Sequence, residues 1–185
     1  MKLEVPWLAR PLLDGYPPVI SAVQDSESAE LQRLAAGRDV LEIGSSFGWS
    51  TIAFCLGGAL HVTGIDPHEE DPRTWDGMAR NMEAYGVADR VTRIRAYSQE
   101  ALPLLAAEGK RFGLIFIDAD HEYPSVRHDL LGSLPLLAPG GLIACHDYFN
   151  APGVQPAVDE LFPAGPLHRV HSLAVLRPGY EKETA

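Results

Sequence analysis

Short apolar runs alternate with segments of helical period along most of the chain. Runs rich in aliphatic and β-branched residues predict strands at 39–44, 60–66, 91–95, 112–118 and 141–147. Between these runs, apolar residues recur at helical spacing, which predicts helices that follow Trp49 or cover 73–85, 98–107 and 124–137. This alternation is typical of parallel βαβ units. Because strands as apolar as GLIFID must be covered on both faces, we expect an α/β fold with a doubly wound, mostly parallel sheet.

The segment before the first strand predicts one further helix. Its apolar residues fit a helix over 21–36, with Asp25, Ser26 or Ser28 as the N-cap and Gly37 as the stop. This helix would precede the alternating core.

The C-terminal part of the chain has a different pattern of apolar residues. GVQPAVDELF predicts one more helix, and LHRVHSLAVLRPG predicts two short strands bent around Ser172, which suits a terminal antiparallel pair. The sequence contains no internal repeat and no linker. We therefore expect a single domain over 1–185, with 1–38 as an N-terminal helical or lid segment and 39–185 as a Rossmann-like core.

Composition narrows the class of protein. The 185 residues are 46% hydrophobic, which suits one compact domain, and the formal net charge of -10 argues against a nucleic-acid partner. Glu4, Pro6 and Pro11 interrupt the N-terminal apolar residues, so we expect neither a signal peptide nor a membrane span, and a cytoplasmic location. Cys55 and Cys145 lie inside apolar stretches and are expected to be reduced core thiols.

A glycine-containing turn links the first core strand to its helix in VLEIGSSFGWSTIAF. Gly44 and Gly48 allow backbone N–H groups at a helix N-terminus to approach a ligand closely. The second strand ends at Asp66, 18 positions after Gly48, where a carboxylate can accept hydrogen bonds from ribose hydroxyls. The pattern therefore predicts a nucleoside site.

The residues of the turn indicate which nucleoside. The spacing differs from the G-x-G-x-x-G of dinucleotide sites, which disfavours a pyrophosphate cradle. Glu42 could receive an ammonium group, and the hydroxyls of Ser45, Ser46 and Ser50 could hold a carboxylate. A nucleoside joined to an amino acid indicates S-adenosyl-L-methionine. The alternative is an ordinary tight turn with solvated serines.

Five ordered motifs carry a resemblance to a known family: VLEIGSSFGWSTIAF, GIDP, RAYSQEALPLL, FIDADHEYPSVRHDL and LLAPGGLIACHDY. Over 39–148 the chain resembles class I S-adenosylmethionine-dependent methyltransferases. It is most similar to the small O-methyltransferases of the macrocin O-methyltransferase and cephalosporin-hydroxylase-like group, and more distantly similar to catechol O-methyltransferase.

The resemblance implies that Glu42, Gly44 and Ser50 contact the methionine end of the cofactor and that Asp66 contacts the ribose. Ser98 and Gln99 fall where such enzymes hold the adenine, although they could also serve as an N-cap pair. We predict a cofactor site of Glu42, Gly44, Ser45, Ser46, Gly48, Ser50, Asp66, Ser98, Gln99 and Asp118.

Acids and histidines follow two of the central strands. FIDADH and CHDY place Asp118, Asp120 and His121 within reach of His146 and Asp147, because the carboxyl ends of parallel strands share one crevice. A divalent cation held there would lower the pKa of an acceptor hydroxyl, and a nearby base would take its proton. For Asp118 and Asp120 the alternative role is helix capping. For His146 it is that of a hydrogen-bonded histidine at a strand end.

The resemblance assigns roles to these residues. It implies that Asp118, His146 and Asp147 ligate a metal and that His121 is the general base, with Asp118 and His121 as the catalytic pair. The family often has Glu-Asp or Asp-Asn at 146 and 147. The His-Asp pair departs from this pattern and shifts the metal preference from Mg²⁺ toward Mn²⁺, Zn²⁺ or Fe²⁺. We expect Mg²⁺ or Mn²⁺ as the second cofactor.

The function predicted on these grounds is O-methyl transfer from S-adenosylmethionine to a hydroxyl of a small molecule, either a sugar or a natural product. The alternatives are a non-catalytic nucleoside-binding domain and, less favoured, a nicotinamide-dependent oxidoreductase. The short chain leaves few residues for a lid, and analogy with related enzymes suggests a homodimer.

Overall fold

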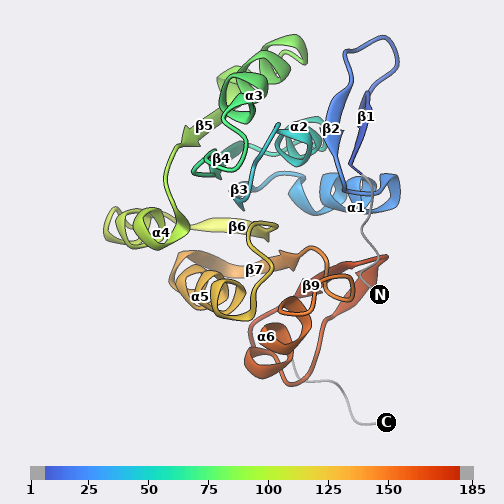
Figure 1. The fold of residues 1–185 in the computed structure, drawn as a ribbon. Coiled ribbons are helices and arrows are strands. Elements are labelled where there is room, and N and C mark those ends of the chain that lie inside the picture. Colours follow the sequence, from blue (N-terminus) through green and yellow to red (C-terminus); the bar gives the residue numbers. More distant parts are fainter. Residues whose placement is uncertain (1–6, 180–185) are drawn as a thin grey trace.

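A seven-stranded sheet forms the centre of the protein within residues 7–179, which are the residues that the computed structural model describes (Figure 1). The strand order is β5-β4-β3-β6-β7-β9-β8, and β3 pairs in parallel with both β4 and β6. Within this sheet the antiparallel pairings are those of β9 with β7 and with β8, and the β8–β9 pair confirms the predicted terminal pair. The strands are β3 (Asp39–Ile43), β4 (His61–Ile65), β5 (Val91–Ile94), β6 (Phe112–Ile117), β7 (Leu137–Cys145), β8 (His168–Val170) and β9 (Leu173–Leu176).

Helices cover both faces of this sheet, as the doubly wound prediction requires. One apolar layer joins α1, α2 and α3 to alternate strand residues such as Val40 and Phe116. The opposite layer joins α4, α5 and α6 to the intervening residues, such as Leu41 and Ile115. The described helices are too short or too polar to cross a membrane. They are α1 (Asp25–Ala35), α2 (Trp49–Leu56), α3 (Arg73–Ala84), α4 (Ser98–Ala107), α5 (Tyr123–Ser133) and α6 (Val154–Leu161), with 3₁₀ turns at Ala88–Arg90 and Leu134–Leu136.

The N-terminal segment differs from its prediction. Strands β1 (Leu8–Arg10) and β2 (Val19–Ser21) form an antiparallel hairpin beside α1 and α2, outside the main sheet (Figure 1). The hydroxyl of Tyr85 accepts a hydrogen bond from the N–H of Leu12 at 2.9 Å and donates one to the carbonyl of Pro17 at 2.9 Å. These anchors lie about seventy positions away in the sequence, so no local pattern indicated the hairpin. Glu4 and Pro6, which were predicted to break an apolar run, lie outside the described residues.

The start of α1 also corrects the sequence prediction. The helix begins at Asp25, and Ser21 belongs to β2 instead. The N-cap is Gln24, not Asp25, Ser26 or Ser28, and Gln24 forms a reciprocal capping box with Glu27. The capping residue was missed because glutamine is not among the preferred N-caps.

The helix predicted over 124–137 is shorter than expected. It ends at Ser133, and the 3₁₀ turn that follows contains Pro135. Pro135 has no backbone N–H to donate to the carbonyl four residues earlier, and its ring would clash with that carbonyl, so the α-helix cannot continue through it. As a result, β7 starts at Leu137, earlier than its prediction, and ends at Cys145. Cys145 and Cys55 are buried free thiols, as expected.

Candidate active site

A cavity of about 1200 Å³ opens at the carboxyl ends of the parallel strands. The loops that follow β3, β4, β5, β6 and β7 line it, and the end of β2 contributes a further edge. This is the place where ligands bind in open α/β sheets. The volume is large enough for a nucleoside together with a second small molecule.

The glycine turn packs directly against the β6 loop. Gly44 has a φ of 94°, and a β-carbon built at this position would lie 2.1 Å from the carbonyl oxygen of Asp118. Only glycine fits such an approach without a shift of the backbone. Gly48, with a φ of 84°, is the residue before α2. The turn predicted to hold the cofactor is thus in contact with the strand end predicted to do the chemistry.

Glu42 lies beneath this turn and is fully buried. Its carboxylate oxygens accept hydrogen bonds from the hydroxyls of Ser50 and Thr51. Burial raises the pKa of Glu42 to about 7, although the two hydroxyls act in the opposite direction. Ser50 lines the cavity, whereas Glu42 is not among the lining residues. A direct contact between Glu42 and an ammonium group stays a prediction. The geometry instead favours a role for Glu42 in holding the hydroxyl of Ser50, which faces the cavity.

Asp66 lines the cavity and holds two loops together. One carboxylate oxygen accepts the N–H of Ser46 at 2.8 Å, and the other accepts the N–H of His68 at 2.6 Å. A carboxylate has further lone pairs, so Asp66 can also accept hydrogen bonds from a diol. His68 is buried, and its Nδ1 lies 2.7 Å from the hydroxyl of Thr74. No motif or spacing indicated that His68 supports the site.

The residues predicted at the adenine end begin α4. Ser98 and Gln99 line the cavity, and the hydroxyl of Ser98 donates to the amide oxygen of Gln99 at 3.3 Å. The N-cap of α4 is Tyr97, and no side chain caps this helix, so the alternative capping role is wrong. Asp129 of α5 also lines the cavity and was missed. Burial raises its pKa to about 6, and one of its oxygens has no hydrogen-bond partner within residues 7–179.

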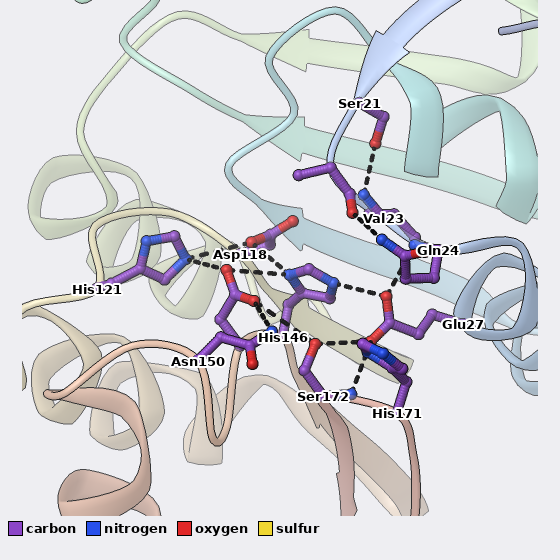
Figure 2. Close-up of polar contacts among 12 residues, drawn as sticks. Ser21, Val23, Gln24, Glu27, Asp118, His121, His146, Asn150, His171 and Ser172 are labelled. Atoms are coloured by element: carbon purple, nitrogen blue, oxygen red, sulfur yellow. Dashed lines mark hydrogen bonds and ion pairs between the residues drawn. The ribbon is translucent and has the colours of Figure 1, made fainter. Parts of the chain in front are cut away.

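Two carboxylates and two imidazoles converge at the ends of β6 and β7 (Figure 2). His121 Nε2 lies 3.4 Å from Asp118 Oδ1 and 3.4 Å from Asp147 Oδ2. On the buried side, His146 Nδ1 lies 3.3 Å from Asp118 Oδ1 and 3.5 Å from Asp147 Oδ2. Asp147 adopts a φ of 54°, an uncommon backbone conformation at a strand end. The convergence expected from the strand ends is therefore present.

Asp120 does not join this cluster. Its carboxylate accepts hydrogen bonds from the N–H of Glu122 at 3.1 Å and from the hydroxyl of Ser125 at 2.6 Å. Both partners belong to the start of α5 or the turn before it. Asp120 therefore binds residues at the entry to α5, although the N-cap of this helix is Glu122 and no side chain caps it, whereas Asp118 faces the histidines.

The charges of the cluster compensate one another. Burial would raise the pKa of Asp118, but His146 and His121 hold it below its ordinary value. Burial likewise opposes the ionised form of Asp147, yet bonding to His146 lowers its pKa. The hydrogen bond to Asp118 raises the pKa of His121. For His146 the effect of burial is outweighed by the two aspartates, and its pKa is raised well above the ordinary value.

The same side chains suit a divalent cation. Asp118, His121 and Asp147 offer ligand atoms that all lie within 4.8 Å of one another. His146 Nδ1 is buried, faces both carboxylates and has no hydrogen-bond partner among the described residues. A cation between these groups would give that nitrogen a partner. Mixed oxygen and imidazole donors suit Mn²⁺, Zn²⁺ or Fe²⁺ better than Mg²⁺. The predicted set of Asp118, His146 and Asp147 is thus brought together, with His121 beside it.

Sequence reasoning missed the partner on the other side of His146. Glu27 of α1 is 0% exposed, and its Oε2 lies 3.0 Å from His146 Nε2 (Figure 2). Its Oε1 accepts hydrogen bonds from the N–H and the hydroxyl of Ser172. These contacts join residues more than a hundred positions apart, so no spacing in the sequence indicated them.

Comparison with known proteins agrees with this geometry. The family described as a methyltransferase domain matches residues 41–148. Among proteins of curated function, none is similar enough to count as a match. The Bacillus cereus O-methyltransferase, solved in complex with S-adenosylhomocysteine (SAH), is 26% identical in sequence. Its structure matches with a TM-score of 0.67 and covers 84% of this chain and 82% of that chain.

Two further solved structures are similar to this chain. Cofactor-bound Rv0187 from MTB is 26% identical, with a TM-score of 0.65 over 75% of this chain and 68% of that chain. A putative O-methyltransferase from Klebsiella pneumoniae is also 26% identical, with a TM-score of 0.63 over 78% of this chain and 70% of that chain. The chain therefore belongs to the methyltransferase domain family, which confirms the resemblance to class I S-adenosylmethionine-dependent methyltransferases that its motifs indicate.

Proposed function

We propose that this protein transfers the methyl group of S-adenosylmethionine to a hydroxyl of a small molecule, with assistance from a divalent metal. One observation carries the proposal: the glycine turn packs against Asp118, so a single cavity joins the cofactor residues to the carboxylate and imidazole cluster. The similar Bacillus cereus enzyme is an O-methyltransferase that binds SAH. The family match argues against the nicotinamide-dependent alternative.

The methionine, ribose and adenine parts of the cofactor would lie in turn against the loops that follow β3, β4 and β5. Ser50 and the turn at Gly44 face the place proposed for the methionine end, with Ser45, Ser46 and Gly48 around it. Asp66 would accept the ribose hydroxyls, and Ser98 and Gln99 would bound the adenine. Methyl transfer is an in-line displacement, so the main task of these residues is alignment of the sulfonium with the acceptor.

Asp118, His146 and Asp147 would hold the metal. When bound, a divalent cation lowers the pKa of the acceptor hydroxyl and fixes its position. His121 is the general base in this proposal. Its side chain is 39% exposed, against 2% for His146, so it is the imidazole of the cluster that an incoming hydroxyl can reach. Asp118 and Asp147, each 3.4 Å from Nε2, would stabilise the imidazolium that forms.

The acceptor would enter from the side of the N-terminal hairpin. Trp7 and Ile20 line the cavity and are both exposed, which provides an apolar edge beside the cluster. Such an edge suits the ring of a natural product or the apolar face of a sugar. Single-domain organisation, a cytoplasmic location and a homodimer stay predictions from the sequence.

The proposal is tested first by calorimetric titration of S-adenosylhomocysteine in EDTA and again with Mn²⁺. We expect binding in both, with a separate or enhanced signal when the metal is present. A protein that binds no nucleoside would contradict the methyltransferase proposal. A protein that binds the nucleoside but releases no S-adenosylhomocysteine across a broad panel of hydroxyl acceptors would favour a non-catalytic domain.

The role of His121 is tested with His121→Ala, and His128→Ala serves as the matched control because His128 is exposed on α5 away from the cavity. We expect His121→Ala to lose turnover while the affinities for S-adenosylhomocysteine and for Mn²⁺ are retained. Normal turnover would refute the base assignment. Loss of Mn²⁺ affinity would instead make His121 a metal ligand.

A further inference from the structure

We propose that Glu27 is a positioning residue for the metal site, which fixes the ring of His146 so that Nδ1 faces Asp118 and Asp147. The inference rests on the proposed function, because it concerns the metal of that site. Glu27 and its partner Ser172 both lie outside residues 41–148, the part of the chain that the methyltransferase family matches. The site would therefore depend on two segments that flank the family domain.

The contacts of Glu27 exceed what a helix cap requires. A capping box needs from Glu27 only the bond that it accepts from the N–H of Gln24, at 2.8 Å, and glutamates are rarely fully buried unless they are paired. Here the side chain is fully buried. Its oxygens also accept the N–H of Ser172 at 2.9 Å and the hydroxyl of Ser172 at 2.6 Å. Oε1 also lies 3.5 Å from Nδ1 of His171, whose side chain is 54% exposed, whereas the contact of Oε2 with His146 is buried on both sides. Burial of a carboxylate is unfavourable without such partners.

The contact with Glu27 determines which ring nitrogen of His146 carries the N–H. Oε2 of Glu27 already accepts the N–H of Gln24, and a carboxylate has no proton to donate, so His146 Nε2 is the donor across the 3.0 Å contact. In a neutral ring this leaves the lone pair on Nδ1. Nδ1 faces Asp118 Oδ1 at 3.3 Å and Asp147 Oδ2 at 3.5 Å and has no hydrogen-bond partner among the described residues.

Two carboxylate oxygens opposite Nδ1 favour a positive charge between them, and a divalent cation would supply it in place of the proton that the ring can carry without metal. Histidines that bind metals almost always donate their other ring N–H to a carboxylate or carbonyl, which fixes the tautomer and the ring orientation. The order Glu27, His146, Asp118 in Figure 2 matches this pattern, and Asp147 lies on the same side of the ring as Asp118. Ser172, in the turn between β8 and β9, holds Glu27 from the opposite side.

The test compares Glu27→Gln with Glu30→Gln. Glu30 lies on the same helix and also pairs with a histidine of the C-terminal strands, His168, at 2.6 Å, but its other partner is Arg33 and not His146. Mn²⁺ affinity is measured by calorimetry, and S-adenosylhomocysteine affinity is measured in EDTA. Loss of a carboxylate that supports a metal-bound histidine typically weakens metal binding by about 10–100-fold. We expect that loss for Glu27→Gln only, with nucleoside affinity unchanged.

Ring-nitrogen NMR of His146 in the Zn²⁺-loaded protein adds a readout that a purely structural role would not move. We expect the Nδ1 resonance to show metal ligation in the wild type and to lose it in Glu27→Gln. If Glu27→Gln does not fold, Ser172→Ala removes one anchor of the Glu27 carboxylate and keeps its charge. The Ser172 hydroxyl also lies 3.5 Å from Asp147 Oδ1, so the Nδ1 resonance of His146 is the readout specific to Glu27 in this variant. Ser172→Ala should weaken Mn²⁺ binding and weaken the signature of metal ligation at Nδ1.

The outcomes separate this inference from the proposed function. Unchanged Mn²⁺ affinity in a folded Glu27→Gln variant would overturn the role of Glu27 and leave the methyltransferase proposal intact. A wild-type protein that binds S-adenosylhomocysteine but no divalent cation would overturn both the metal assignment and this inference. Equal losses in Glu27→Gln and Glu30→Gln would show a general effect of α1 and would also overturn it.

Discussion

Replacement of Glu42 by glutamine should make the protein progressively more stable than the wild type as the pH rises. Glu42 is fully buried, and burial raises its pKa from 4.5 to about 7. Between these two values the folded state holds a proton that the unfolded state has released. Stability therefore falls as the pH rises through this window, because the folded protein must ionise a buried group. Glutamine does not titrate and avoids this penalty.

The expected size follows from the pKa shift. One unit of pKa shift corresponds to about 1.4 kcal/mol, so the wild type should lose about 2.5 kcal/mol relative to Glu42→Gln between pH 5 and pH 8. The hydroxyls of Ser50 and Thr51, which donate to Glu42, can rotate and accept from the amide of a glutamine. Any fixed cost of that rearrangement is the same at both pH values and cancels.

The assay is urea unfolding of both proteins at pH 5 and at pH 8, without cofactor or metal. The quantity of interest is the change, between the two pH values, in the difference between their free energies of unfolding. Other titrating groups are common to both proteins and drop out of this difference. A difference that stays constant from pH 5 to pH 8 would refute the reasoning, since Glu42 would then ionise alike in the folded and unfolded states.

Two other predictions concern the glycine turn and the ribose site. Gly44→Ala should abolish S-adenosylhomocysteine binding and destabilise the protein more than Gly58→Ala does. Both glycines have similar positive φ values, but only the β-carbon at Gly44 meets backbone, and equal unfolding free energies for the two variants would contradict this view. Asp66→Ala should weaken S-adenosylhomocysteine binding at least about tenfold in calorimetry, because hydrogen bonds to a charged group are each worth about 1.5–3 kcal/mol. Unchanged affinity would remove Asp66 from the nucleoside site.

The sequence by itself determined the layered architecture and the place of the chemistry. Continuous apolar runs in the strands, with apolar residues at helical period between them, favour one arrangement in which helices cover both faces of the sheet. Because parallel strands end at one edge, the residues after β3, β4, β6 and β7 had to meet there. Asp118, His146 and Asp147 could be placed together for this reason, which depends only on local patterns.

Only the tertiary structure decided which partners surround these residues. The hairpin of β1 and β2 depends on Tyr85, and the fit of Gly44 depends on the backbone of Asp118. The contact between Glu27 and His146 joins a helix before the sheet to its last parallel strand. Local patterns report the conformational preferences of neighbouring residues. They carry no signal for a contact across the chain, because such a contact exists only once the sheet and its helices have packed.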